Sequence, residues 1–326
     1  WGGWFPSSIP ELYLTSGIGD AVCLGQGELT FPEMLRAAEL AAGGDLAAMD
    51  KELEKVAGLA LWRDGQVHLT PRRAVEHLNN LPPPSFHLID LQKYYELNRR
   101  TAGVGHRVRN RLPPPPPFDK PDHPYRGLSY FSSFGCPEPC EFCCSPEIAG
   151  RRWVALDPAV MVDRIHELYK QDPFDILRLQ DANFGVAEKR TKVFCERLIS
   201  TGMNIRWNGT VEIKQICQYS DETIDLLRDS GCHLLWFGAE SATEGRGKWP
   251  EQSANTLKSL AVLMDKYGDK LDPATKMGLT QAINARMPGL VPVPEMSPED
   301  LSGANWQTQL FARDQTDPGW RDRLAE

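Results

Sequence analysis

The sequence contains no long apolar run. A membrane-spanning helix needs about 18 or more consecutive apolar residues, and no such stretch occurs among the 326 residues. The chain begins at Trp1, and neither a basic leader nor the apolar segment of a secretion signal follows it. We therefore expect no membrane span, and we interpret the chain as part of a longer protein.

Positive charge is scarce as well. The chain has 36 Lys and Arg residues against 44 Asp and Glu residues, which gives a formal net charge of -8. It therefore lacks the long-range basic field of general nucleic-acid-binding proteins, and no nucleic-acid partner is expected. Hydrophobic residues make up 41% of the sequence, which suits a globular protein of one large domain or two ordinary ones.

The eight cysteines are unevenly spread along the chain. A secreted disulfide framework would usually be a shorter chain with a higher cysteine density. Four of the eight instead fall within nine residues, at Cys136, Cys140, Cys143 and Cys144. This clustering predicts metal ligation in a reducing compartment, so a cytoplasmic location is expected.

Residues 1–80 predict a small α/β unit. Residues 20–24 form a short apolar run that predicts a strand, and a glycine turn and a helix beginning near Thr30 follow it. Residues 63–66, Arg-Asp-Gly-Gln, predict a hairpin turn. Residues 81–124 are rich in proline, with five in succession, and predict an extended linker.

Strands and helices are expected to alternate from residue 125 to about residue 267. Asp157 and Pro158 mark the start of one helix, as its N-cap and its first helical residue. The alternation predicts a parallel sheet, either open or closed into a barrel. Residues 268–326 have weak periodicity and form an uncertain carboxyl-terminal tail. The strands are expected at 127–134, 174–180, 205–213 and 232–237.

The functional loops of parallel sheets lie beyond the carboxyl ends of the strands. The cysteine cluster follows the first expected strand, and polar side chains follow the other three. We therefore expect all of them to lie at the same edge of the sheet, beyond the carboxyl ends of the strands. Each carboxylate among them has an ordinary alternative as a helix cap or a solvated loop charge. The polar residues are Asp181, Asn183, Glu212, Glu240 and Ser241.

The strongest motif places Cys136, Cys140 and Cys143 at the spacing C-x3-C-x2-C. Three thiolates on one short loop can converge on an iron–sulfur cluster, because these centres prefer soft sulfur ligands. Three ligands for four irons leave one iron open to a small molecule. A zinc site is the alternative, but zinc would want a fourth ligand at motif spacing, and only the adjacent Cys144 and the distant His123 offer one.

This motif, with the aromatic Phe142 just before its third cysteine, resembles that of the radical S-adenosylmethionine superfamily. The resemblance extends over about residues 125–241. It implies a partial (β/α) barrel and a [4Fe-4S] cluster whose open iron chelates S-adenosylmethionine. Reductive cleavage of that cofactor would produce a 5′-deoxyadenosyl radical, which abstracts hydrogen from a carbon of a small-molecule substrate. The resemblance further implies an electron donor such as flavodoxin or ferredoxin.

The resemblance also implies roles for the loop residues. Phe142 would lie against the adenine, and Asp181 and Asn183 occupy the place where the family often handles the methionyl amine. Asp-Ala-Asn-Phe stands there instead of the usual Gly-Gly-Glu, a variant typical of the cobalamin-binding branch. Glu240 and Ser241 occupy a place of ribose or carboxylate contacts. The residues implied to bind this cofactor are Phe142, Asp181, Asn183, Glu212, Glu240 and Ser241.

Residues 1–80 resemble the carboxyl-terminal part of a Rossmann-like cobalamin-binding domain. Glycines there would let the backbone approach the cofactor closely. The Asp-x-His-x-x-Gly motif that usually supplies the lower cobalt ligand is missing and would lie before residue 1. Cobalamin is therefore an implied cofactor without its usual ligand in this chain. The residues implied to bind it are Gly2, Gly3, Gly25, Gly27 and Glu28.

The sequence thus predicts an α/β protein in which a partial barrel of the radical S-adenosylmethionine type follows part of a Rossmann-like domain. The resemblance implies hydrogen abstraction and methyl transfer from methylcobalamin to a substrate carbon. Radical-driven ring formation or rearrangement is the alternative within the same branch. A catalytically incomplete fragment that binds an iron–sulfur cluster, and a zinc-binding interaction module, are alternatives from other classes.

Overall fold

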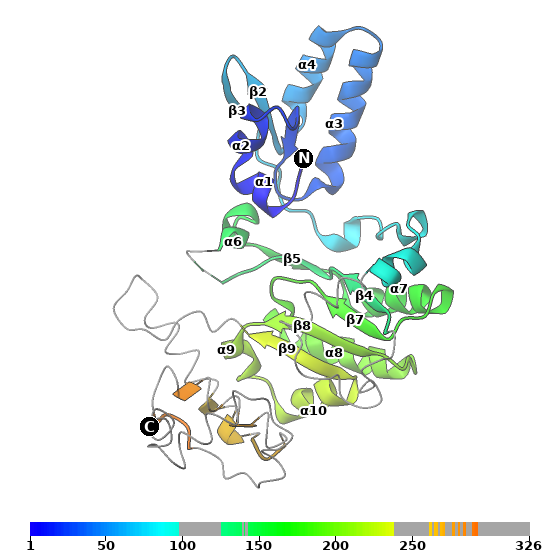
Figure 1. Cartoon of the computed structure of the whole chain (residues 1–326), viewed down its shortest axis with the longest axis vertical. Helices are drawn as coiled ribbons and strands as arrows, with labels where there is room; N and C mark the ends of the chain where they lie inside the picture. Colours follow the sequence, from blue (N-terminus) through cyan, green and yellow to red (C-terminus); the bar gives the residue numbers. More distant parts are fainter. Residues whose placement is uncertain are drawn as a thin grey trace, which may run out of the picture. The chain divides into compact units, whose positions relative to one another are not determined.

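The chain forms two compact units in the computed structural model (Figure 1). The first consists of Trp1–Thr210 with Asp221–Trp236, and the second of Val211–Ser220 with Phe237–Glu326. Among the described residues, none of the helices combines the length and the apolar character that crossing a membrane requires. The structure describes residues 1–97, 125–138, 140, 143–237, 261–262, 264–266, 268–270, 276–277, 280, 283–284 and 289–292.

The amino-terminal part of the first unit is built on a three-stranded sheet of order β1-β2-β3. Its core includes Val22, Leu59 and Ala60, none of which has exposed surface. The strands are β1 (Ala21–Cys23), β2 (Leu59–Arg63) and β3 (Gln66–Leu69). The helices are α1 (Trp4–Ser8), α2 (Pro10–Thr15), α3 (Gly27–Ala42) and α4 (Leu46–Lys55).

The predicted strand, glycine turn and helix appear here as β1, Gly25 and α3. The predicted hairpin is also present: Arg63 pairs with Gln66 across a turn in which Asp64 and Gly65 have φ values of 49° and 75°. Such positive φ values are those that a tight hairpin turn requires. Because this turn reverses the chain, β2 and β3 pair antiparallel, as do β1 and β2. The described sheet therefore lacks the parallel pairing of a doubly wound domain.

The second sheet of this unit has the order β4-β7-β8-β9. β4 pairs parallel with β7, and β7 pairs parallel with β8, so the predicted parallel sheet is confirmed. The strands are β4 (Gly127–Tyr130), β7 (Ile176–Leu179), β8 (Arg206–Val211) and β9 (Cys232–Phe237). The intervening helices are α7 (Pro158–Gln171), α8 (Glu188–Ser200) and α10 (Asp221–Asp229).

The first strand of the predicted parallel sheet is shorter than expected. β4 ends at Tyr130, and β5 (Ser133–Gly135) pairs antiparallel with β6 (Trp153–Ala155) in a separate two-stranded sheet. At the break, the backbone N–H of Ser132 donates to the carboxylate of Asp181 at 2.6 Å instead of to a neighbouring strand.

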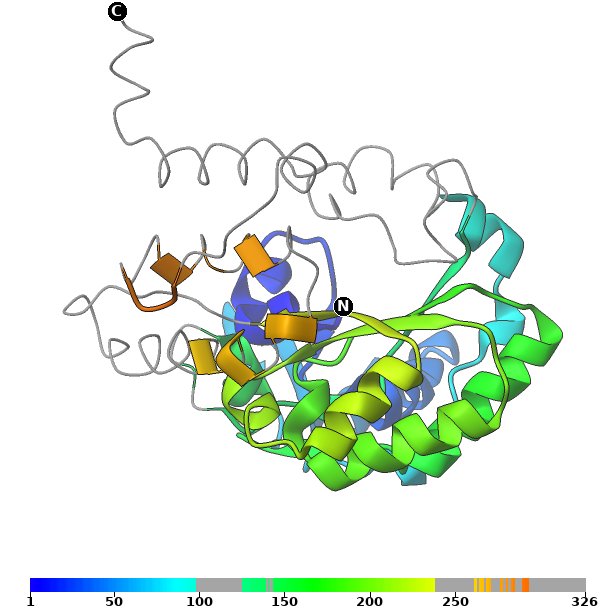
Figure 2. The same cartoon turned by 90° about the horizontal axis from the view of Figure 1, so that it is seen from below.

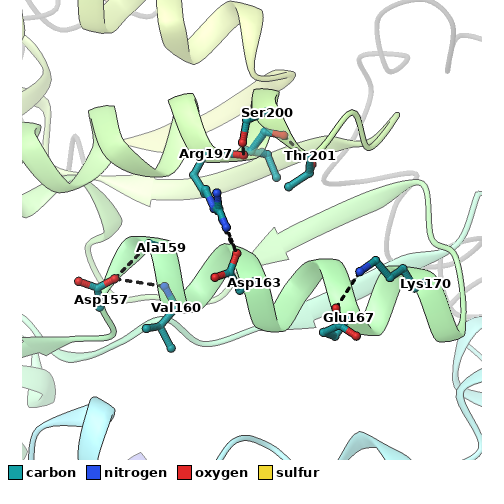
Figure 3. Close-up of polar contacts among 10 residues, drawn as sticks. Asp157, Ala159, Val160, Asp163, Glu167, Lys170, Arg197, Ser200 and Thr201 are labelled. Carbon is teal, nitrogen blue, oxygen red and sulfur yellow. Dashed lines mark hydrogen bonds and ion pairs between the residues drawn. The ribbon is translucent and has the colours of Figure 1, made fainter.

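The helices begin and pair through specific polar contacts (Figure 3). Asp157 caps α7 as predicted, and its carboxylate accepts from the backbone N–H groups of Ala159 and Val160 at 2.9 and 3.1 Å. Arg197 on α8 donates to Asp163 on α7 at 2.7 Å. This pair is about half exposed, so it aligns the two helices and contributes at most about 1 kcal/mol.

The four-stranded sheet has two different faces. One face packs on α8, where Trp207 lies fully buried against Phe184 and Phe194 with ring centroids 5.5 and 5.2 Å away. The helices α7, α8 and α10 lie together on this side of the strands (Figure 2). Since side chains alternate along a strand, Arg178 and Arg206 point to the opposite face from Leu177 and Trp207.

The second unit is described over a smaller set of residues. It contains α9 (Ile213–Ile216) and a buried cluster of Met264, Ile283 and Val291. The side chain of Asn284 both donates to the Val291 carbonyl and accepts from its N–H, at 2.7 and 3.1 Å. These contacts give this unit a small core of its own.

Replacing Trp207 with alanine tests the core on the helix side of the sheet. Removal of a fully buried tryptophan leaves a large cavity, so Trp207→Ala is expected to lower the free energy of unfolding by about 3–5 kcal/mol. Trp62→Ala is the control, because Trp62 also lies in a strand but is 42% exposed, and its effect should stay near 0.5 kcal/mol. Urea unfolding followed by circular dichroism measures both, and equal losses would contradict this packing.

Candidate functional site

The cysteine loop is entered through a glycine that no other residue could replace without strain. Gly135, the last residue of β5, has a φ of 82°. A Cβ at this position would collide with the carbonyl oxygen of Arg152 and lie 2.7 Å from the Cβ of Ala149. The left-handed backbone at Gly135 therefore turns the chain sharply from the β5–β6 hairpin into Cys136.

The three motif cysteines are all partly exposed. The N–H of Cys143 donates to the carbonyl of Cys140 at 3.2 Å. Cys143 also caps α6 (Cys144–Ile148), where its sulfur accepts from the N–H of Ser145 at 3.4 Å. Among the described residues, no group of three or more His, Cys, Asp and Glu side chains is arranged to hold a single metal ion. In a four-iron cluster, by contrast, each thiolate binds a different iron.

Cys136 lies next to a residue from the end of β7. Burial raises the pKa of the Cys136 thiol, and hydrogen bonds from the Glu138 backbone and the Asn183 side chain act in the opposite direction. Asn183 is only 2% exposed, and its carbonyl accepts from the indole N–H of Trp153 at 3.2 Å. The structure thus brings together two of the residues predicted for the site, Cys136 and Asn183.

Asp181 has a buried environment. Its side chain is 2% exposed, and its carboxylate accepts from both the backbone N–H and the hydroxyl of Ser132. Burial raises the pKa of this carboxyl, and the Ser132 hydrogen bonds and the Arg190 charge oppose the rise. Asp181 therefore ties the end of β7 to the segment that leads into β5 and the cysteine loop.

Arg190 belongs to the same network and was not predicted from the sequence. It is 8% exposed and donates to the Ser132 hydroxyl at 2.8 Å and to the Leu156 carbonyl at 3.2 Å. Its guanidinium carbon lies 5.7 Å from the centre of the Trp153 ring. One signal was available, because Arg190 stands four residues before Phe194 and so shares the buried face of α8.

Glu212 lies in the second unit. Its carboxylate accepts from the N–H groups of Lys214 and Gln215 at 2.6 and 3.2 Å and thereby caps α9. The structure thus places Glu212 in the helix-cap role that was its ordinary alternative. Phe142, Glu240 and Ser241 lie outside the described residues.

The candidate glycines of residues 1–80 have unlike surroundings. Gly25 has a φ of 74° and donates to the Ser7 hydroxyl at 3.0 Å, and a Cβ there would lie 3.7 Å from the carbonyl oxygen of Ile148 in α6. A Cβ at Gly2 would lie 3.7 Å from Cys23. Gly3 and Gly27 have open space around them, and Glu28 lies in the first turn of α3.

One polar contact joins this amino-terminal part to the helix after the cysteine loop. Arg72 donates to the carbonyl of Glu147 at 2.7 Å, near the carboxyl end of α6. A cation is favourable there because the last carbonyls of a helix carry partial negative charge.

Two curated methyltransferases are similar to the chain, and no family model matches it. An uncharacterized methyltransferase of Pyrococcus horikoshii is 26% identical over 247 residues, covering 74% of this chain and 46% of that protein. The cytidylyl-2-hydroxyethylphosphonate methyltransferase of Streptomyces wedmorensis is 23% identical over 268 residues, covering 74% of this chain and 44% of that protein. The chain therefore spans less than half the length of these relatives.

Solved structures of similar fold include cobalamin-dependent radical S-adenosylmethionine enzymes. OxsB with aqua-cobalamin has a TM-score of 0.55 and 18% identity, covering 80% of this chain and 34% of that one. The radical S-adenosylmethionine methyltransferase TsrM from Kitasatospora setae, with tryptophan and a cofactor analogue, has a TM-score of 0.51 and 16% identity, covering 81% and 47%. The resemblance stated from the sequence is thus confirmed at the level of the fold.

Gly135→Ala tests whether the entry to the cysteine loop depends on the left-handed backbone. Strain at φ 82° and the collision with Arg152 are expected to lower the free energy of unfolding by about 1–3 kcal/mol. Gly27→Ala is the matched control, because a Cβ there meets nothing within 4 Å. Thermal and urea unfolding measure both, and a neutral Gly135→Ala would contradict the tight turn.

Asp181→Asn tests the buried carboxylate through its pH dependence. Because the folded pKa of Asp181 is raised, its contribution is fully present below the unfolded pKa of about 3.9 and is lost as pH rises through the folded value. Asparagine does not titrate, so the stability of the natural chain relative to Asp181→Asn should decrease from about pH 4.5 to 7.5. Urea unfolding of both chains at the two pH values measures this, and an increase would show that Ser132 and Arg190 outweigh burial.

Proposed function

We propose that this chain, which has the fold of cobalamin-dependent radical S-adenosylmethionine enzymes, uses Cys136, Cys140 and Cys143 to hold a [4Fe-4S] cluster. The observation that carries the proposal is the C-x3-C-x2-C loop, which is entered through Gly135 and has Asn183 against its first cysteine. Its position supports the proposal too, because Asn183 follows a strand of a parallel sheet, where functional loops lie.

The donor set fits such a cluster. It consists of three soft thiols on one loop, and three ligands leave one iron free to bind a small molecule. Burial raises the pKa of the Cys136 thiol, and this thiol would be deprotonated when it binds metal. When bound, the cluster supplies the electron for reductive cleavage of S-adenosylmethionine.

The chain's own residues then have separate tasks in the proposal. Asn183 donates to the Cys136 sulfur and orients that ligand. Asp181 and Arg190 act as positioning residues, because both engage Ser132 rather than a surface open to a cofactor. The remaining predicted cofactor contacts, Phe142, Glu212, Glu240 and Ser241, stay as predictions.

Methyl transfer is favoured over ring formation and rearrangement. Both curated relatives are described as methyltransferases, and one of the solved structures is a radical S-adenosylmethionine methyltransferase. The acceptor would be a carbon of a small-molecule substrate, and the electron would come from a donor such as flavodoxin or ferredoxin. Because the chain spans less than half of its curated relatives, the complete reaction is proposed for the whole protein.

Cobalamin would bind on the amino-terminal part in this proposal. OxsB and TsrM are both described with cobalamin bound, and Gly25 approaches α6, the helix that follows the third cysteine. The proposed organisation is residues 1–80 as the cobalamin-domain part, 81–124 as the linker, 125–267 as the radical core and 268–326 as the tail. The candidate cobalamin contacts are Gly2, Gly3, Gly25, Gly27 and Glu28.

Cysteine variants test the cluster directly. After anaerobic reconstitution, Cys136→Ala, Cys140→Ala and Cys143→Ala should each lose most of the iron and sulfide, because each removes one of three ligands. Cys144→Ala is the matched control and should retain both, since Cys144 is exposed and adjacent to a ligand. Metal and sulfide analysis measures the content. A colourless protein holding one zinc would support the zinc module instead.

Electron paramagnetic resonance of the reduced protein extends this test to the cofactor. A four-iron signal that changes on addition of S-adenosylmethionine, with release of 5′-deoxyadenosine, is the expected result. A cluster whose signal ignores the cofactor would instead support the catalytically incomplete fragment.

A further inference from the structure

The face of the four-stranded sheet opposite the helices carries basic side chains from three neighbouring strands. Arg178 lies on β7, Arg206 on β8 and His233 on β9. In the parallel register Ile176 is opposite Arg206. Arg178 stands two residues after Ile176 on the same strand, so Arg178 and Arg206 project from the same face of the sheet. Burial is the largest cause that lowers the pKa of His233, and the charges of Arg206 and Arg178 lower it further.

Arg178 is the centre of this group. Burial is the main cause that lowers the pKa of its guanidinium, and the nearby Tyr94 phenol acts in the opposite direction. No carboxylate pairs with Arg178 within the part of the chain that the structure describes. Arg178 is partly buried. A partly buried cation without an ion-pair partner is costly, so it calls for an explanation.

A glycine lies close to each of the two arginines. A Cβ at Gly127 on β4 would lie 3.1 Å from the guanidinium carbon of Arg178. A Cβ at Gly231, just before β9, would lie 2.6 Å from the carbonyl oxygen of Ile205 and 3.3 Å from Nη1 of Arg206. Gly127 therefore leaves space for the Arg178 guanidinium, whereas Gly231 is required first by the nearby Ile205 carbonyl.

The histidine has an unused nitrogen. Nδ1 of His233 is buried and has no hydrogen-bond partner among the described residues. Burial is the largest cause that lowers the pKa of this imidazole, and the two arginines add to it. Neutral donors border the same face, since the Gln180 amide donates to the Ser129 hydroxyl at 3.4 Å and Ser129 is opposite Arg178 in the sheet.

Two guanidinium groups and an imidazole suit an anion with more than one negative charge. Arginine presents a planar arrangement of N–H donors that matches the oxygens of a phosphate group. The imidazole can take up a proton when the anion arrives, because a nearby negative charge favours its charged form.

We propose that Arg178, Arg206 and His233 form a binding site for a phosphate or phosphonate group carried by the substrate. Only the identification of the ligand as substrate rests on the proposed radical function. Anion binding does not require the iron–sulfur cluster. The result of the phosphate titration is therefore independent of the iron and sulfide analysis and of the electron paramagnetic resonance experiment.

Titration with inorganic phosphate tests the site. We expect phosphate to raise the thermal unfolding temperature of the natural chain, with a dissociation constant measurable by calorimetry. Arg178→Met should weaken binding about tenfold or more, and His233→Phe should weaken it several-fold. The matched control is Arg197→Met, which removes a half-exposed arginine on α8 and should leave binding unchanged. Natural affinity in Arg178→Met would overturn the proposal.

Stability without phosphate separates a binding role from a structural one. If Arg178 binds an anion, Arg178→Met should unfold at the same temperature as the natural chain or higher without phosphate, because a partly buried charge without an ion-pair partner has been removed. A large fall in that temperature would show a structural arginine and count against the site. Arg178→Lys is a second variant in case Arg178→Met does not fold, because lysine keeps the positive charge. It should bind phosphate less well than the natural chain, because lysine lacks the planar guanidinium group.

The choice of anion identifies the ligand class. A phosphate monoester and methylphosphonate should bind at least as well as inorganic phosphate if the group belongs to a substrate. Binding of inorganic phosphate alone would overturn that assignment in favour of a free-ion site. Equal binding of acetate would overturn the phosphate class, and chloride at matched ionic strength should have no effect.

Discussion

The buried contact between Asp181 and Ser132 is the constraint on which the candidate site depends. It joins the carboxyl end of β7 to the segment between β4 and β5, and Arg190 closes the network from α8. Burying a carboxylate and a guanidinium is favourable only when their hydrogen bonds are satisfied. The network therefore tolerates few alternative positions of Ser132, and three residues later Gly135 turns the chain into the cysteine loop.

The two faces of the four-stranded sheet differ in composition: the face toward the helices is apolar, and the opposite face carries basic side chains. Trp207, Phe184 and Phe194 pack on the helix side and account for much of the apolar core there. Arg178 and Arg206 project from the other face, where they add nothing to the apolar core. The proposed anion site rests on the partial burial of Arg178 together with its positive charge.

The sequence predicted those features that depend on local patterns. The alternation of apolar segments predicted the parallel sheet, Asp157 and Pro158 predicted the start of α7, and residues 63–66 predicted the hairpin. It did not predict the division of the first strand, because that depends on Asp181, far along the chain, taking the backbone hydrogen bond of Ser132. The roles of Arg190 and Arg178 were missed for the same reason. A charged residue in a helix or strand is ordinarily solvated, and only the tertiary structure shows that Arg190 is buried and Arg178 partly buried.

Strand β7 connects the two proposed halves of the site. Arg178 lies within the strand, and Asp181 and Asn183 follow its carboxyl end. Three residues of extended chain span about 10 Å, so an anion held by Arg178 would lie a short distance along the strand from the residues that border the cysteine loop. This spacing suits a small substrate that is anchored by its charged group and presents a carbon to the reacting centre. Binding energy from a group remote from the reacting carbon can orient that carbon, which is how such an anchor would contribute to rate as well as to affinity.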